Sequence, residues 1–392
     1  MAKGVKLFWG LVVLAIIIVI VALARTPSVQ KPSASETGPI KIGAVVPLTG
    51  DSAAYGLPIQ RAGLLAVEEI NAAGGVNGRP FEVVWEDGKC DAKEASVAAQ
   101  KLINIDDTKM IFGGVCSSET LAMAPLAETA KVLIVSPSAT SPDITGAGDF
   151  IFRTAPSDAT AGDVAAQYAM SKVGARKAAV ISETKDYAQG LRRVFTEKFK
   201  ASGGEVVADE TYNSGDTDFR TQILKIKSAN PDVVYILPQT SSPGILILKQ
   251  LAANGVSASR LTAEVLIGRN IVAENKKEME GVVGIENWFD EKGDLAAKML
   301  TTYKQKYNED APFPSFMANM YSQFYLIKDA IEKVGLDTEK LRDYLYELKE
   351  WKHALGSLTF DKNGDPVGLP YSVKKVENGE LKELEIYRPE VK

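Results

Sequence analysis

The sequence predicts an α/β protein with two lobes, each a parallel β-sheet sandwiched between helices, preceded by a hydrophobic N-terminal helix. Short β-branched runs alternate with longer amphipathic stretches from residue 40 onward, and this alternation is typical of strand–helix–strand units in parallel sheets. The alternation restarts near residue 155. Two blocks of roughly 120 residues each indicate two related lobes rather than one large sheet.

The composition limits the functions that the chain can have. It has 392 residues, 45 Lys and Arg against 50 Asp and Glu, a formal net charge of −5 and a hydrophobic fraction of 45%. These values are typical of a globular protein, and the acidic balance without basic blocks argues against nucleic acid as a partner. His353 is the only histidine, and Cys90 and Cys116 are the only cysteines. A zinc site with several Cys and His ligands therefore cannot form, and a histidine-dependent triad would have to use His353.

The first 24 residues differ from the rest of the chain. Lys3 and Lys6 precede Leu7–Ala24, an uncharged run of 18 residues. The run is longer than the usual signal-peptide core of ~7–15 residues and shorter than the ~20 residues of a spanning helix. It could therefore be a cleaved signal peptide or a membrane anchor, and its length favours the anchor. Both place the body outside the cytoplasm, because the lysines keep the N-terminus inside. Residues 25–39, rich in Pro, Ser and Thr, are predicted to be a flexible linker.

The first block contains four predicted strands, each a short apolar run. The helix after the first strand places Ile59, Val67 and Ile70 on one face, and Gly74-Gly75 ends it. The predicted strands are Ile40–Val46, Phe81–Glu86, Met110–Phe112 and Val132–Val135, and the helices are Pro58–Ala73, Ala92–Ile103 and Thr120–Ala130.

The second block begins after Phe150–Arg153 with a new helix over Asp158–Val173. Gly203-Gly204 ends another helix, and Asn230-Pro231 leads into a strand. The predicted strands are Ala178–Ser182, Glu205–Glu210, Val233–Leu237 and Val282–Glu286, and the further helices are Ala188–Ser202, Asp218–Ala229 and Gly244–Asn254.

The last hundred residues return to helices and then strands. Helices are predicted over Asp294–Tyr307, Phe316–Val334 and around Glu339–Lys349, and the Asn-Gly turns at Asp361–Gly364 and Glu377–Gly379 predict hairpins. We expect this part to complete both lobes. Lobe I is then predicted to comprise residues 40–155 and about 288–355, and lobe II residues 156–287 and about 356–392.

Two hydroxyl-rich turns follow neighbouring predicted strands. Ser117–Thr120 begins a helix, and Ser136–Pro142 follows the next strand. A helix cap explains the first turn taken alone, but hydroxyls and free N–H groups at a helix start also bind carboxylates or phosphates. Because both turns lie at the carboxyl ends of strands, where open α/β sheets bind ligands, the pair indicates a binding crevice.

The two cysteines are 26 positions apart, each near a strand–helix junction. In an exported protein such a pair predicts a disulfide between Cys90 and Cys116, with free buried thiols as the alternative.

Several sequence features argue against catalysis and metal binding. The chain has no GxxxxGK[ST] phosphate loop and no GxSxG motif. The acidic stretch Asp361–Asp365 resembles the start of a calcium loop but lacks its glycine spacing and distal glutamate, so we predict a turn. His353 is expected on the surface at a charged helix end. The sequence therefore predicts no catalytic residue, no cofactor and no metal.

Segments spread over nearly the whole of Ile40–Leu384 follow the pattern of one known family. They are Ile42–Gly50, Tyr55-Gly56, Ile70–Gly78, Cys90-Asp91, Gly113–Ser118, Pro137–Pro142, Asp186-Tyr187, Asp216–Phe219 and the helix around Tyr321. These segments resemble the leucine/isoleucine/valine-binding proteins, the extracytoplasmic solute-binding receptors of branched-chain amino acid ABC transporters. The resemblance implies a type I periplasmic binding protein fold, with two α/β lobes, three hinge crossings and a ligand in the cleft.

The resemblance also implies the ends of an amino-acid site. Ser117 and Thr140 match the residues that bind the ligand α-carboxylate through hydroxyls and backbone N–H groups. The backbone carbonyl of Ser138 matches the acceptor of the α-ammonium, and Ala139 lies between these positions. Glu264 aligns with the carboxylate of lobe II that pairs with the ammonium.

The side-chain end of the site departs from the family pattern. Tyr55 and Tyr187 resemble the aromatic walls of the two lobes, but Gln239 stands where an aromatic residue often lines the pocket and Ala188 replaces a common glycine. The resemblance implies capture of a branched-chain amino acid or an analogue by hinge closure and delivery to an ABC permease. The alternatives are a receptor of the same fold for amides, short peptides or aromatic and organic acids, and an extracellular sensory module.

Overall fold

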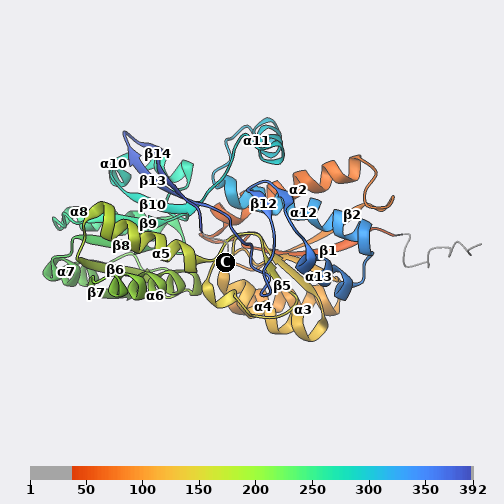
Figure 1. Cartoon of the computed structure of the whole chain (residues 1–392), viewed down its shortest axis with the longest axis horizontal. Helices are drawn as coiled ribbons and strands as arrows, with labels where there is room; N and C mark the ends of the chain where they lie inside the picture. Colours follow the sequence, from red (N-terminus) through yellow and green to blue (C-terminus); the bar gives the residue numbers. More distant parts are fainter. Residues whose placement is uncertain (1–37, 390–392) are drawn as a thin grey trace, which may run out of the picture. The chain divides into compact units, whose positions relative to one another are not determined.

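The computed structural model describes residues 38–389 (Figure 1). The predicted hydrophobic helix and most of the predicted linker lie outside these residues. Within residues 38–389, no helix is long and apolar enough to cross a membrane.

The first sheet has five parallel strands in the order β2-β1-β3-β4-β5. Its register pairs Ile40 with Phe81 and Gly43 with Ile111. We call this sheet and the helices packed on it lobe I. Its elements are β1 (Ile40–Val46), α2 (Ala53–Ala72), β2 (Phe81–Asp87), α3 (Ala92–Asn104), β3 (Met110–Gly113), α4 (Ser117–Ala130), β4 (Leu133–Ser136), the 3₁₀ turn η2 (Pro142–Ile144) and β5 (Ile151–Arg153).

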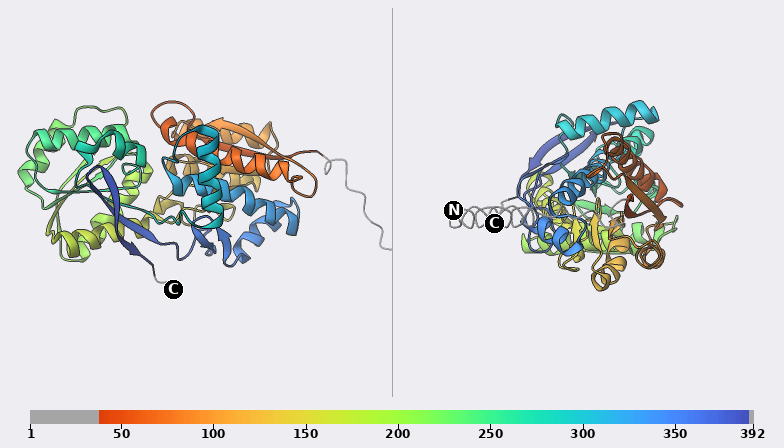
Figure 2. Two further views of the ribbon diagram at one scale, coloured as in Figure 1. Left: turned by 90° about the horizontal axis from the view of Figure 1, so that it is seen from above. Right: turned by 90° about the vertical axis from the view of Figure 1, so that its right-hand side faces the viewer.

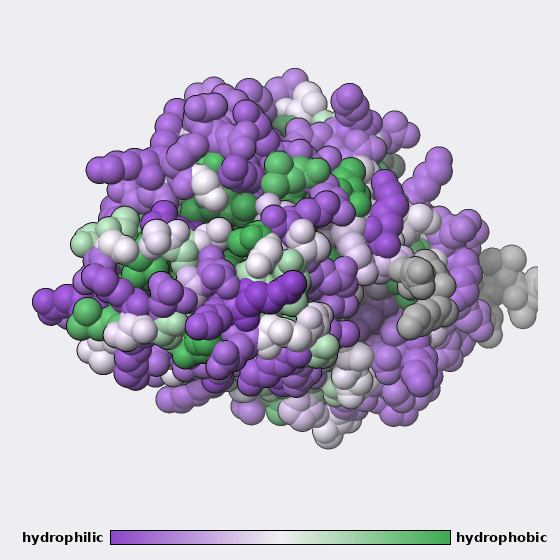
Figure 3. Space-filling model, turned by 60° about the vertical axis from the view of Figure 1, so that its left-hand side comes forward, coloured by the Kyte–Doolittle hydropathy of each residue, from purple (hydrophilic) through white to green (hydrophobic). Residues whose placement is uncertain are grey.

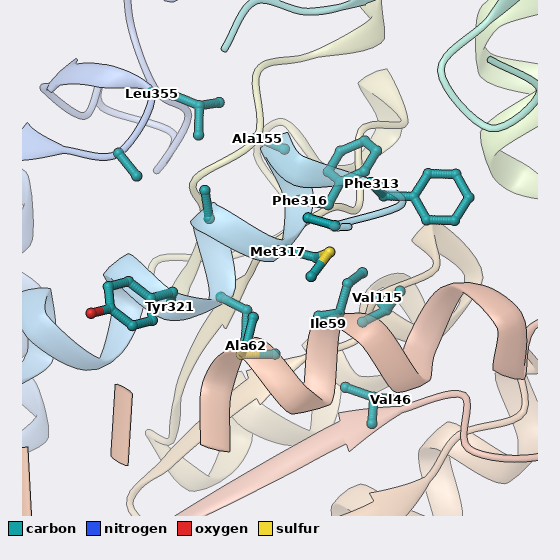
Figure 4. Close-up of a cluster of buried hydrophobic side chains, with 14 of the residues drawn as sticks. Val46, Ile59, Ala62, Val115, Ala155, Phe313, Phe316, Met317, Tyr321 and Leu355 are labelled. Atoms are coloured by element: carbon teal, nitrogen blue, oxygen red, sulfur yellow. The ribbon is translucent and has the colours of Figure 1, made fainter. Parts of the chain in front are cut away.

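Three helices from later in the chain join lobe I. They are α11 (Asp294–Tyr307), α12 (Pro314–Val334) and α13 (Thr338–Glu347), and a small hairpin of β11 (Trp351–His353) and β12 (Gly356–Leu358) follows them. Helices α2 and α12 pack together on one face of the sheet, and α3 and α4 on the other (Figure 1). In the core, Met317 of α12 points toward Ile59 of α2 (Figure 4).

The second sheet has seven strands in the order β14-β13-β10-β9-β8-β6-β7, and we call it and its helices lobe II. Five strands are parallel, and the β13–β14 hairpin joins them antiparallel at one edge (Figure 2). The elements are α5 (Asp158–Tyr168), the π-helix η3 (Ala169–Val173), β6 (Lys177–Glu183), α6 (Asp186–Ala201), β7 (Glu205–Tyr212), α7 (Arg220–Ala229), β8 (Val233–Leu237), α8 (Ser241–Ala253), β9 (Ser259–Ala263), α9 (Arg269–Glu274), α10 (Lys276–Met279), β10 (Val283–Asn287), β13 (Tyr371–Glu377) and β14 (Glu380–Tyr387).

The chain passes between the two sheets three times, over residues 154–157, 288–293 and 359–370. The predicted α/β architecture and the parallel sheets are confirmed. The predicted division of residues between the lobes stays a prediction. The turn at Asp361 is present as predicted: its carboxylate accepts hydrogen bonds from the N–H groups of Asn363 and Asp365.

Several element predictions need correction. Helix α2 begins at Ala53 instead of Pro58, and the predicted helix over Asp158–Val173 changes to a π-helix at Ala169. Strand β9 was not predicted, because Ser259, Arg260 and Thr262 interrupt its apolar pattern. This segment is a strand because it pairs with β8 and β10, so its conformation is set by tertiary contacts and not by its local sequence.

The prediction of a surface histidine is wrong. His353 lies in β11, is only 6% exposed, and its Nδ1 accepts a hydrogen bond from the Leu355 N–H. Burial lowers the pKa of His353 to about 3. The predicted helix around Glu339–Lys349 ends at Glu347, and the chain then forms the β11–β12 hairpin, which local periodicity does not indicate.

The surface carries few large apolar side chains. On the face in Figure 3, hydrophobic groups lie in small islands among polar residues. Among the described residues, the exposed large hydrophobics are Val97, Ile105, Leu224 and Leu384. Scattered single residues of this kind are normal for a globular protein.

Candidate functional site

The two hydroxyl-rich turns of lobe I meet, as expected from neighbouring parallel strands. The Ser117 hydroxyl accepts a hydrogen bond from the Ser141 N–H at 3.1 Å. The Ser138 hydroxyl donates to the Val115 carbonyl at 2.8 Å. The cap of α4 comes from Cys116, with the Glu119 side chain accepting from its N–H, so Ser117 is not the cap. These bonds hold the backbone of both turns in one rigid unit.

Two hydroxyls in this unit are buried without a hydrogen-bond partner among residues 38–389. They are Thr140 Oγ1 and Ser118 Oγ, and Thr140 is only 1% exposed. A buried hydroxyl without a partner costs free energy, so such groups are commonly found where a ligand supplies the partner. Ala139 lies fully buried between Ser138 and Thr140.

Lobe II contributes two buried carboxylates. Glu264 follows β9, and Asp158 is the first residue of α5. One oxygen of Glu264 and both carboxylate oxygens of Asp158 have no hydrogen-bond partner in the described part of the chain. The Asp158 N–H donates to the Thr140 carbonyl at 2.8 Å, which places it directly beside the lobe I turn.

The two carboxyl groups interact electrostatically. Burial raises the pKa of Asp158 to about 7, against smaller lowering effects of Thr140 and Arg153. Burial also raises the pKa of Glu264 well above its usual value, and the nearby Asp158 raises it further. Two buried carboxyls that resist ionisation form a region where a cation is favoured.

Sequence reasoning missed Asp158. Its sequence signal, an acidic residue after Pro156-Ser157 at a helix start, is that of an ordinary first-turn residue. Its role depends on the contact between α5 of lobe II and the loop around Thr140 of lobe I.

The two predicted aromatic residues belong to opposite lobes. Tyr55 of α2 is half-buried and packs edge-on against Phe313 and Phe316, with ring centroids 5.0 and 5.7 Å apart. Tyr187 of α6 is buried. Burial raises the pKa of both hydroxyls, and the negative charge of Glu264 raises it further.

Gln239 follows β8 and is 7% exposed. Its N–H donates to the Glu183 carboxylate at 2.9 Å, and its Nε2 lies 3.8 Å from Sγ of Cys116, while its Oε1 has no partner among the described residues. Gln239 of lobe II therefore contacts the residue that precedes Ser117 in lobe I.

A model of the family described as periplasmic binding protein matches residues 39–380. The chain belongs to this family. A relative from Pseudomonas aeruginosa, named a leucine-, isoleucine-, valine-, threonine- and alanine-binding protein, is 34% identical over 337 residues, 85% of this chain and 89% of the relative.

Solved structures of similar proteins have the same fold. The branched-chain amino acid transporter substrate binding protein LivJ of Streptococcus pneumoniae, solved with isoleucine, has a TM-score of 0.81 at 29% identity over 90% of this chain and 100% of its own. A solute binding protein of an ABC transporter from R. palustris, solved with benzoate, has a TM-score of 0.80 at 22% identity over 90% of this chain and 97% of its own.

Family membership confirms the type I periplasmic binding protein fold that the resemblance implied. Proteins of this family bind small molecules for ABC transporters and are not enzymes, and their place is outside the cytoplasm. The predicted disulfide of this binding protein is also confirmed: Cys90 and Cys116 are bonded, with a Cα–Cα distance of 5.3 Å.

The disulfide of the binding protein lies at the edge of the cleft. The buried Glu119 accepts hydrogen bonds from the N–H groups of both Cys90 and Cys116 at 2.9 Å. From lobe II, the Lys185 ammonium donates to the Cys90 carbonyl at 3.3 Å, and Arg193 pairs with Asp143 at 2.6 Å. The two lobes thus contact each other at the disulfide residue Cys90 and at Asp143.

Proposed function

We propose that this binding protein captures a free α-amino acid, of the branched-chain type or an analogue, and delivers it to an ABC permease. The observation that carries the proposal is the pair of buried carboxyls, Asp158 and Glu264, beside the unpaired hydroxyl of Thr140 in the described part of the chain. A zwitterion needs hydrogen-bond donors at one end and negative charge at the other, about one amino-acid length apart.

Each end of the ligand has assigned groups. Ser117 and Thr140 bind the α-carboxylate, through hydroxyls and backbone N–H groups. The Ser138 carbonyl, Asp158 and Glu264 receive the α-ammonium, and its charge offsets the repulsion between the two carboxylates. Tyr55 and Tyr187 enclose the ligand from the two lobes, and Ala139 and Gln239 complete the lining.

The division of these groups between the lobes provides the mechanism of capture. The hydroxyls lie in lobe I and both carboxylates in lobe II. Only a closed cleft allows one ligand to contact both sets, so the ligand has a higher affinity for the closed form and shifts the protein toward it. The closed form is then the species delivered to the permease.

An aromatic acid is the alternative ligand class, since the R. palustris protein of the same fold was solved with benzoate. The two buried carboxyls favour an α-amino acid for this chain, because an ammonium group can pair with their charged forms and an aromatic acid has no such group.

The discriminating test is Glu264→Gln. We expect the substitution to weaken binding of an α-amino acid by about 3–5 kcal/mol, because the buried ammonium loses a charged partner. A desamino analogue of the same side chain should bind with little change. Isothermal titration calorimetry measures both, with the exposed Glu274→Gln on α9 as the matched control. Equal amino-acid affinity in the wild type and Glu264→Gln would contradict the proposal.

We further propose that Leu7–Ala24 anchors the protein to the membrane, with the body outside. Mass spectrometry of the protein from its native membrane should then find residues 1–24 intact. An N-terminus at Arg25 would show cleavage as a signal peptide instead.

A further inference from the structure

A cavity of about 250 Å³ lies at the cleft, beside the candidate site. Both lobes line it: Ser52, Lys89 and Cys90 come from lobe I, and Lys185, Gln239 and Thr240 from lobe II. Most of the residues that line it are polar, and Pro243 and Leu246 are its aliphatic side chains. A pocket for a leucine-type side chain is lined mainly by apolar groups, so this lining favours another kind of side chain.

Gln239 is a buried lining residue whose side-chain amide has unused hydrogen-bonding capacity. Its side chain is buried, its Oε1 has no partner within residues 38–389, and its Nε2 reaches only the disulfide sulfur of Cys116 at 3.8 Å. Sulfur is a weak acceptor. An aliphatic ligand side chain against this amide would leave both of its polar groups without a proper partner, and a site of this kind discriminates against such ligands.

Several charged side chains around the cavity already have partners within the protein, so they do not indicate a charged group on the ligand. Glu183 accepts from the Gln239 N–H and from the Ser214 hydroxyl, and Lys185 donates to the Cys90 carbonyl. Lys89 lies 3.6 Å from Glu94. The lining has two lysines against the three acidic residues Asp51, Glu183 and Asp216, so neither sign of charge dominates.

The position of Gln239 fits a side chain that leaves the α-carbon of a bound amino acid. Its amide contacts Cys116, and the next residue, Ser117, is assigned to the ligand α-carboxylate. We propose that Gln239 determines specificity and that the ligand is an α-amino acid with a neutral hydrogen-bonding side chain, an amide or a hydroxyl, in preference to leucine, isoleucine or valine. This inference rests on the proposed function, which supplies the two α-groups, and of its two ligand types it selects the analogue over the branched-chain amino acid.

Calorimetry with glutamine, asparagine, threonine, leucine and isoleucine tests the inference. We expect the wild type to bind at least one of the three polar amino acids about tenfold or more tighter than leucine. Gln239→Leu should reverse this order, weakening the polar ligand and strengthening leucine. Gln239→Met, which keeps the length of the side chain, serves as a second variant in case the branched leucine side chain packs poorly at this position. Gln100→Leu on the exposed face of α3 is the matched control and should leave the affinity order unchanged.

The outcomes separate the two proposals. The role of Gln239 would be overturned if the wild type bound leucine more tightly than every polar amino acid. It would also be overturned if both folded Gln239 variants kept the affinity order of the wild type. Either result would leave the amino-acid function standing. Absence of binding to all α-amino acids by the wild type would overturn the proposed function itself, and this inference with it.

Discussion

Thr140 and Ser117 both have hydroxyl side chains, but their hydroxyls differ in their hydrogen bonding. The Thr140 hydroxyl is buried and has no partner in the described chain, whereas the Ser117 hydroxyl accepts a hydrogen bond from the Ser141 N–H. Thr140 therefore has its hydrogen-bonding capacity available for a ligand, and Ser117 combines its proposed ligand contact with support of the neighbouring loop. Substitutions at the two residues should differ in their effect on stability.

Thr140→Ala should weaken binding of the ligand by about 1.5–3 kcal/mol, because a charge-assisted hydrogen bond to the α-carboxylate is lost. It should lower the stability of the ligand-free protein less than Ser117→Ala does, since the Thr140 hydroxyl makes no hydrogen bond among residues 38–389 and only helps to lower the pKa of Asp158. Ser117→Ala should lower both affinity and stability. Calorimetry and urea unfolding measure the two quantities, and Thr221→Ala on the exposed surface of α7 is the control. Unchanged affinity in Thr140→Ala and Ser117→Ala would place the carboxylate elsewhere.

The buried Asp158 predicts a specific dependence of stability on pH. Burial raises its pKa from 3.8 to about 7, so the folded ligand-free protein binds this proton more tightly than the unfolded chain. Its contribution to stability is complete below about pH 4 and is lost as pH rises through about 7. Asp158→Asn should remove this contribution. Urea unfolding of ligand-free protein from pH 4 to pH 8 should show a smaller decline in the variant, and parallel curves would contradict this account.

At the scale of elements, one buried side chain connects a hinge crossing to the loop of Thr140. Arg153 ends β5 and is fully buried; its Nε and Nη2 donate to the two Asp365 carboxylate oxygens at 2.6 and 2.8 Å. Its Nη1 donates to the Ser141 carbonyl at 2.8 Å. Asp365 lies in the third crossing, residues 359–370. The bidentate pair therefore fixes the crossing relative to the loop next to the candidate site.

Arg153→Met should destabilise the protein by about 3–5 kcal/mol, because it leaves the carboxylate of Asp365 without its charged partner. Ligand affinity should fall as well, since the Ala139–Ser141 backbone loses a donor that positions it. Arg220→Met removes an exposed pair with Asp218 and should change little. Urea unfolding and calorimetry on both variants test this. Loss of stability in Arg153→Met with full affinity would mean that the network supports the fold only.

At the scale of the whole binding protein, the two lobes meet closely at Gly190 of α6. A Cβ atom placed on Gly190 would lie 2.7 Å from Pro142 Cδ and 3.1 Å from Ser141 Oγ, both in lobe I. Helix α6 belongs to lobe II, so this contact exists only when the lobes are together. The close approach makes Gly190 sensitive to any side chain.

Gly190→Ala should weaken ligand binding without lowering the stability of the ligand-free protein. Alanine stabilises a helix interior by about 1 kcal/mol relative to glycine, so ligand-free protein should be as stable as the wild type or slightly more so. The added methyl should oppose closure and weaken ligand binding. Calorimetry and thermal unfolding without ligand check both effects. Equal or tighter ligand binding by Gly190→Ala would show that closure does not need this contact.

Much of the molecule could be predicted from the sequence because its signals are local. Apolar runs and amphipathic spacing gave most strands and helices within a few residues, as for β1, β8 and α11. The compartment indicated by the N-terminal segment led to the Cys90–Cys116 disulfide. Hydroxyls after two neighbouring strands indicated where Ser117 and Thr140 would meet, since parallel strands align their carboxyl ends.

The sequence by itself therefore determined the α/β class, the family and the disulfide, and it indicated the lobe I half of a candidate site. Only the tertiary structure revealed Asp158 beside Thr140, the burial of His353, and the Arg153–Asp365 pair. Each of these depends on which distant segments come into contact and on how far water is excluded from them. Residue type and local spacing do not show which distant residues a side chain contacts or how deeply it is buried, because both are set by packing of the whole chain.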